Sequence, residues 1–324
     1  MEQAPVTLTP RQPYDFNLTA SSAVSFRDRY GTNWFDGAVF RRLLDLKGKP
    51  CLISVHSVGT PDSPRLEGKV TGTSLDEATV AAAKHQIAWL LDTDTDLSPF
   101  YAMASQDPIL APLVGGLRGL HLPHTASVFE ALILAILGQQ ISSQVAYQLR
   151  TRLTEIYGAP MKIEGVTYHA FPHPEALLAA GVAGLRALKF SARKAKYIFD
   201  IADAVASGKL ALEELRYRPD DEVIRRLTSI RGAGHWTAHW LLISALGRSD
   251  GFPHNDLALR RTLGLLFNQG EPFPAEEALR YSGRWSPFRS YVTAYLFAAV
   301  RSGRLAELSG SQPSSHPMTE PGIK

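Results

Sequence analysis

The segment from Leu227 to Arg261 constrains the fold of this chain more than any other. It reads LTSIRGAGHWTAHWLLISALGRSDGFPHNDLALRR, which gives the end of one helix, a glycine-rich turn, a second helix, a loop, and an acidic residue before a third helix. Gly232 and Gly234 allow positive φ angles and let another backbone approach closely. Free N–H groups at a helix N-terminus beside such a turn bind anions. A plain structural corner, with glycine closing the first helix, fits the same residues. This segment alone leaves both interpretations open.

The same glycines also imitate a dinucleotide-binding fingerprint, because Gly232, Gly234 and Ala238 follow its spacing. That fingerprint requires a β-strand immediately before the turn. The residues that precede it here, DDEVIRRLTSI, have the acidic start and apolar spacing of a helix. A nicotinamide or flavin site is therefore rejected.

Asp256 is the candidate for the chemical group. The simplest interpretation of an aspartate before a helix is an N-cap. Trp236 and Trp240, however, are four residues apart and share one helix face, and their helix leads through a short loop to Asp256. Aromatic faces beside a carboxylate form a pocket suited to a flat, cationic group. Core packing is the alternative role for both tryptophans.

A metal centre is not expected. His235 and His239 have a spacing that can bind zinc, but no glutamate lies between them in the HExxH pattern and no third ligand is apparent. The single cysteine, Cys51, excludes an internal disulfide, a cysteine-rich zinc site and a cysteine-held iron–sulfur cluster.

Composition is that of an ordinary globular protein. The 324 residues are 45% hydrophobic and 20% charged, with a net charge of +3, which permits a nucleic-acid partner without demanding one. The N-terminus has no signal-peptide pattern. The most apolar run, Phe129 to Leu137, is too short to span a bilayer and carries Glu130. We expect a cytoplasmic protein of two or three domains with no membrane partner.

The order of elements predicts an α+β fold. Residues 8–73 contain short Val-, Ile-, Leu- and Phe-rich runs between turn signals, which is typical of an antiparallel sheet linked by hairpins. Ser74 to Leu91 changes to helical spacing, and from Phe100 onward the chain is almost entirely helical. Helices are expected over Ser127–Leu137, Ser142–Tyr157, Pro174–Ala180, Ser191–Ser207, Asp220–Ile230, His235–Leu246, Asp256–Phe267 and Ser286–Arg301.

Five sequence segments together resemble the AlkA-type DNA-3-methyladenine glycosylase II family of the helix–hairpin–helix DNA glycosylase superfamily. They are PYDF at 13–16, GLRGLHLP with VFEALILAILGQQIS, LTSIRGAGHWTAHW, PHNDLALRR, and RWSPFRSYVTAYLF, and they occur in the family's order. The resemblance implies an N-terminal domain of antiparallel sheet with helices over 9–99 and a helical domain of two subdomains over 100–304. Residues 305–324, rich in serine and proline, are predicted to be a disordered tail.

The resemblance also implies an activity. A monofunctional enzyme of base excision repair would bind double-stranded DNA as a monomer, flip out an alkylated base such as 3-methyladenine or 7-methylguanine, and hydrolyse its N-glycosidic bond. Asp256 matches the catalytic aspartate. Trp236 takes the position where bifunctional members carry a catalytic lysine, so a covalent lyase step is not expected. A non-catalytic DNA-binding protein and a glycosylase of other base specificity are the alternatives.

Further site residues follow from the same resemblance. Trp240 and Phe297 match aromatic positions of the base pocket, and Trp236 is expected to line the same pocket. Leu257 stands where a tyrosine is expected, and Ser22, by a loose alignment, where a phenylalanine is. The implied DNA-contacting residues are Gln139, Gln140, Gly232, Gly234 and Thr237, with Gln140 in the place of an apolar wedge. No cofactor is required, although hairpin main-chain oxygens in related structures hold a monovalent cation.

Overall fold

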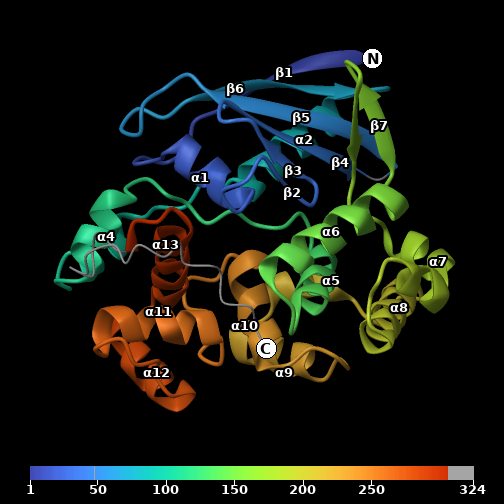
Figure 1. Ribbon diagram of the computed structural model, residues 1–324. Coiled ribbons are helices and arrows are strands. Elements are labelled where there is room, and N and C mark those ends of the chain that lie inside the picture. Colours follow the sequence, from blue (N-terminus) through green and yellow to red (C-terminus); the bar gives the residue numbers. More distant parts are fainter. Residues whose placement is uncertain (47, 306–324) are drawn as a thin grey trace.

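The computed structural model describes residues 1–46 and 48–305. Its N-terminal part is a six-stranded antiparallel sheet with the strand order β1-β6-β5-β4-β3-β2. The strands are β1 (Glu2–Leu8), β2 (Arg29–Tyr30), β3 (Asn33–Phe35), β4 (Val39–Leu46), β5 (Lys49–Ser57) and β6 (Leu66–Gly72). With the many helices that follow, this sheet confirms the predicted α+β class (Figure 1).

Two helices cover one face of this sheet. They are α1 (Phe16–Ala23), capped by Asp15, and α2 (Glu77–Leu90), capped by Asp76. Alternate strand residues such as Phe40 and Ile53 are buried in one cluster with α1 and α2, as the two-residue period of a strand dictates. The prediction of a β-rich start at residue 8 was wrong in two respects. The sheet begins at Glu2, and the segment after PYD is helical because Asp15 starts a helix there.

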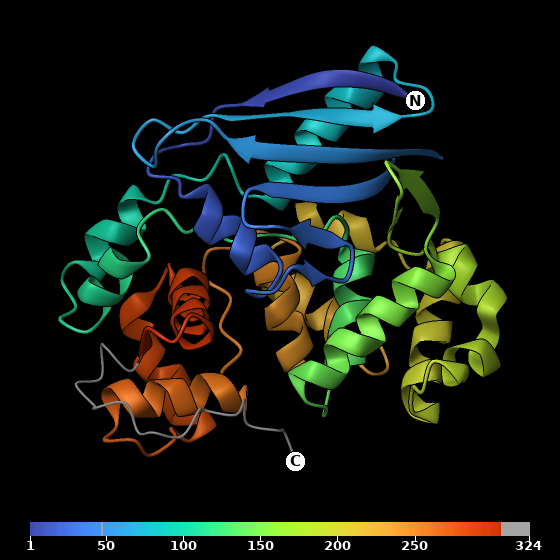
Figure 2. The same ribbon diagram turned by 45° about the horizontal axis from the view of Figure 1, so that its top comes forward.

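The opposite face of the sheet is partly covered by a hairpin that the sequence analysis missed. Strands β7 (Pro160–Ile163) and β8 (Val166–His169) pair with each other and lie against one end of the sheet (Figures 1 and 2). Met161 and Tyr168 bury Leu43 and Leu52 of the sheet. The prediction of an almost entirely helical chain after Phe100 was therefore wrong here.

The helices beyond the sheet form two clusters that share α10. They are α3 (Ser98–Ala104), α4 (Leu110–Gly116), α5 (Val128–Gly138), α6 (Ser143–Tyr157), α7 (Pro174–Ala187), α8 (Ala192–Ala206), α9 (Asp220–Thr228), α10 (His235–Ser244), α11 (Leu257–Phe267), α12 (Ala275–Ser282) and α13 (Arg289–Arg301), with 3-10 turns η1 (Leu212–Tyr217) and η2 (Gly283–Trp285). One cluster combines α5 to α10, and the other combines α3, α4 and α10 to α13. Figure 1 shows α10 between the two. The domain boundary expected from the sequence, between residues 99 and 100, lies inside α3.

A buried ion pair joins the sheet to the helices. Arg42 on β4 donates to Glu130 on α5 at 2.6 Å, and both side chains are only 3% exposed. Arg42 also donates to Asn33 at 2.7 Å. Since a buried charge is costly without its partner, this pair ties the two parts of the chain to one relative arrangement.

Two further expectations need comment. The helix predicted over Pro174–Ala180 continues to Ala187 across a kink at Gly181. The φ of Gly181 is 63°, a value that glycine adopts easily. The predicted tail lies outside the described residues, apart from Leu305. Within 1–46 and 48–305, no helix combines the length and apolar character needed to cross a membrane.

Candidate functional site

Asp256 is held by two hydrogen bonds, one to each carboxylate oxygen. Oδ1 accepts from the backbone N–H of Leu259 at 2.9 Å, which makes Asp256 the N-cap of α11. Oδ2 accepts from the indole Nε1–H of Trp236 at 2.7 Å. The N-cap interpretation and the link to the tryptophan pair are therefore both correct. The positive end of α11 stabilises negative charge on this carboxylate.

Aromatic rings extend from Asp256 in a row. The rings of Trp236 and Trp240 have centroids 6.2 Å apart in an edge-to-face arrangement, and Trp240 lies 5.7 Å from Phe297 on α13. All three side chains are half-buried, so their faces are not sealed in the core. Leu257, the first residue of α11, is also half-buried. The structure thus brings together one carboxylate and three aromatic residues from three helices.

The loop that carries Asp256 is fastened to the start of α13. Arg289 donates from Nε and Nη2 to the two oxygens of Asp250, each at 2.7 Å, and Ser290 accepts from the backbone N–H of Gly251 at 2.8 Å. Burial favours the neutral carboxyl of Asp250, but hydrogen bonds from Arg289 and Ser286 outweigh it and lower the pKa of Asp250. Arg289 belongs to the RWSPFRSYVTAYLF segment that carries the resemblance, but no local pattern indicates that it binds Asp250.

His239 fastens the same loop from the side of α10. Its Nδ1 accepts the backbone N–H of Phe252 at 3.3 Å, so the ring is neutral at that nitrogen. Burial, with the charges of His254, His235 and Arg289 nearby, lowers the pKa of His239 to about 4. No group of three metal-binding side chains occurs in the part of the chain that the structure describes.

The glycine turn joins α9 to α10. Gly232 has a φ of 96°, and a Cβ there would lie 2.4 Å from Cδ2 of Tyr197, so both conformation and space require glycine. Gly234 differs from the expectation, because its φ is −106° and a Cβ would meet nothing within 4 Å. As the N-cap of α10 without a side chain, Gly234 leaves the first N–H groups of α10 open to an anion.

Gln139 connects the turn after α5 to the glycine turn between α9 and α10. Its Nε2 donates to the carbonyl of Gly232 at 2.9 Å and to Oγ1 of Thr237 at 3.2 Å. Thr237 is buried, and its side chain faces Gln139 rather than solvent. Gln140 is exposed, with a φ of 54° that is rare for a residue other than glycine. A cation at the hairpin backbone stays a prediction. The carbonyls of Ile230 and Gly232 each accept one hydrogen bond, which leaves each oxygen a second lone pair.

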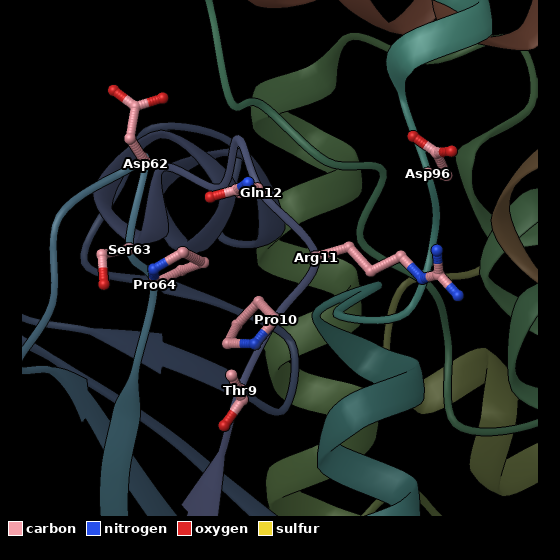
Figure 3. A pocket seen from close by; sticks show the side chains of 8 residues that line it. All are labelled: Thr9, Pro10, Arg11, Gln12, Asp62, Ser63, Pro64 and Asp96. Atoms are coloured by element: carbon pink, nitrogen blue, oxygen red, sulfur yellow. The ribbon is translucent and has the colours of Figure 1, made fainter.

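A surface pocket lies elsewhere. It has a volume of about 430 Å³ and is lined by residues 9–12, the turn 62–64 and Asp96, and Figure 3 shows Arg11 and Asp96 on one side of it and Asp62 on the other. None of these residues belongs to the segment around Asp256. The pocket therefore adds no group to the carboxylate and its aromatic row.

Comparisons with known proteins find similar sequences and similar structures. Residues 133–287 match the family model described as HhH-GPD superfamily base excision DNA repair protein. A DNA-3-methyladenine glycosylase of Bacillus subtilis is 34% identical over 209 residues, which are 64% of this chain and 69% of that relative. The solved 3-methyladenine DNA glycosylase of Archaeoglobus fulgidus superposes with a TM-score of 0.81 at 28% identity, covering 92% of this chain and 98% of the other. A Schizosaccharomyces pombe 3-methyladenine DNA glycosylase solved with abasic DNA superposes at 0.55 with 30% identity, over 63% of this chain and 97% of the other.

Proposed function

The chain belongs to the HhH-GPD superfamily of base excision DNA repair proteins, and from that premise we propose that it is a monofunctional glycosylase that removes 3-methyladenine and 7-methylguanine from duplex DNA. That it is a DNA glycosylase acting on alkylated bases follows from its relatives and its fold. The parts that we propose are the monofunctional chemistry, the preference for these two bases, the duplex substrate and a monomeric enzyme.

Asp256 carries the proposed chemistry. When the bond from C1′ of the sugar to the base nitrogen breaks, its electron pair leaves with the base and positive charge develops on the sugar. A carboxylate oriented by Trp236 and by the N-terminus of α11 stabilises that charge. Water then adds its oxygen to C1′ and gives up one proton to solvent. A base that is already cationic leaves as a neutral molecule, so no general acid is needed.

The aromatic row supports the choice of substrate. Trp236, Trp240 and Phe297 offer half-buried π surfaces beside Asp256. Such surfaces attract flat cations, and N-alkylated purines are flat and cationic. The extruded base would stack along this row, with its sugar beside the carboxylate.

The absence of lyase chemistry rests on Trp236. The indole at this position has no nucleophilic amine, and its Nε1–H is engaged with Asp256. A Schiff base with the sugar requires a nucleophilic amine such as that of lysine. The single observation that carries the proposal is therefore the Trp236–Asp256 hydrogen bond at the end of the aromatic row.

Chromatography of bases released from methylated DNA tests this function. Wild-type protein should release 3-methyladenine and 7-methylguanine, and borohydride should trap no covalent protein–DNA adduct. If a methylated duplex yields no free base under any salt condition, the substrate is wrong. A borohydride-stable adduct would overturn the monofunctional assignment.

A further inference from the structure

Lys194 makes contacts that its neighbours on the same helix do not. It lies on the first turn of α8, where Arg193 and Lys196 are exposed. The Lys194 side chain is instead half-buried, and its Nζ donates to the carbonyl of Leu137 at 2.8 Å and to the carbonyl of Gln139. Burial lowers its pKa. Lys194 is thus directed into the protein rather than toward solvent.

The two carbonyls that Lys194 holds belong to the C-terminus of α5. Carbonyls in the last turn of a helix have no partner within the helix, and a cation there satisfies them and complements the helix dipole. Lys194 therefore fixes the place where α5 stops and the turn of Gln139 and Gln140 begins. The N-cap of α8, Ser191, in turn fixes the backbone of Lys194.

The turn of Gln139 and Gln140 is also held from the opposite side, by the glycine turn between α9 and α10. The side chain of Gln139 donates to the Gly232 carbonyl and to Thr237, while its backbone carbonyl accepts from Lys194. Next to these two sets of hydrogen bonds, Gln140 has a left-handed backbone conformation and remains exposed. A non-glycine residue pays for that conformation, so the surrounding contacts must enforce it.

We propose that Lys194 is a positioning residue for base extrusion, which sets the α5–α6 turn so that Gln140 enters the duplex when the base leaves. This inference rests on the proposed function. Lys194 is not a phosphate contact, because its ammonium faces two protein carbonyls. It is not a nucleophile either, since an amine that donates two hydrogen bonds as an ammonium has no free electron pair.

The test compares excision of one 7-methylguanine from two duplexes, with cytosine or with an abasic-site analogue opposite the lesion. Extrusion costs less when the base is unpaired. Lys194→Met should lower the single-turnover rate on the paired lesion about a hundredfold, as for other misplaced groups, and should keep most of the wild-type rate on the unpaired lesion. Lys194→Arg, which still donates to carbonyls, should restore most of the rate on the paired lesion.

Because each variant serves as its own reference, the ratio of the two rates is independent of how much protein is folded. Lys194→Gln is the second variant if the methionine form is not recovered, and the same ratio applies. Arg193→Met is the matched control: it removes an adjacent exposed charge, so it should weaken binding and reduce its salt dependence without changing the ratio. For Lys194→Met the salt dependence should stay at the wild-type value.

Two results would overturn the proposal. One is an equal loss on both duplexes, which would mean a general structural role. The other is a salt dependence reduced as in Arg193→Met, which would make Lys194 a phosphate contact. Failure of the proposed function itself appears differently, because wild type would then release no 7-methylguanine from either duplex.

Discussion

The indole Nε1–H of Trp236 lies 2.7 Å from Oδ2 of Asp256, and Oδ1 of the same carboxylate caps helix α11. The carboxylate therefore cannot rotate without breaking at least one hydrogen bond. Fixed orientation of charge is what electrostatic stabilisation of a transition state requires. The tryptophan at this position is then a support for the aspartate as well as a member of the aromatic row.

Trp236→Phe keeps an aromatic ring but removes the donor. Because a hydrogen bond to a charged group contributes about 1.5–3 kcal/mol, base release should slow by about ten- to a hundredfold. Single-turnover rates of wild type, Trp236→Phe, Asp256→Asn and the double variant measure this. If the donor acts through Asp256, Trp236→Phe should add little to Asp256→Asn, and full additivity would contradict it.

Gly232→Ala should destabilise the fold by about 1–3 kcal/mol, because the residue has a positive φ and its new Cβ would collide with Tyr197. Gly234→Ser is the matched substitution, since that position has space, a negative φ and an N-cap role that serine fills well. Urea unfolding compares the two. Equal destabilisation of both variants would show that the turn is not constrained as the structure indicates.

Arg289→Lys should weaken the fastening of the loop before Asp256, because lysine cannot make the bidentate contact with Asp250. We expect base release to fall about tenfold while affinity for DNA changes little, since small misplacements of catalytic groups are costly. Arg65→Lys, in an exposed pair with Glu67, controls for the exchange itself. Unchanged base release by Arg289→Lys would mean that the Arg289–Asp250 contact does not position Asp256.

His239 predicts a pH dependence of stability. Its pKa is about 4 in the folded protein and 6.5 ordinarily, so unfolding takes up a proton between these values. Stability should therefore fall as pH drops from 6.5 toward 4. His239→Asn keeps an acceptor for Phe252 but cannot titrate, so its stability should fall less. Urea titrations at about pH 5 and 7.5 measure this, and identical pH dependence of both proteins would contradict it.

The sequence could predict that Asp256 precedes a helix and that Gly232 lies in a tight turn, because each residue belongs to a local pattern. An acid before a helix and a glycine between two helices have their meaning within a few residues. The order of these patterns along the chain then indicated the family, and the comparisons confirm it.

Long-range contacts left no such pattern. Arg42 and Glu130 are 88 positions apart, and neither neighbourhood shows that the two will pair. Lys194 could not be distinguished from Lys196 on the same helix, because only the placement of α5 decides which is buried. The β7–β8 hairpin has strands of four residues, and its stability comes from packing on Leu43 and Leu52 rather than from its own sequence.

Release of 7-methylguanine from a defined duplex by wild type and Asp256→Asn, with DNA affinity measured in parallel, decides whether the Asp256 carboxylate carries the chemistry. The substitution keeps the shape and removes the charge that stabilises the sugar cation. Release should fall by at least about a hundredfold, the loss expected when a group that stabilises transition-state charge is removed, while affinity for the duplex stays near that of wild type. Full release by Asp256→Asn would mean that the Asp256 carboxylate does not stabilise the sugar cation.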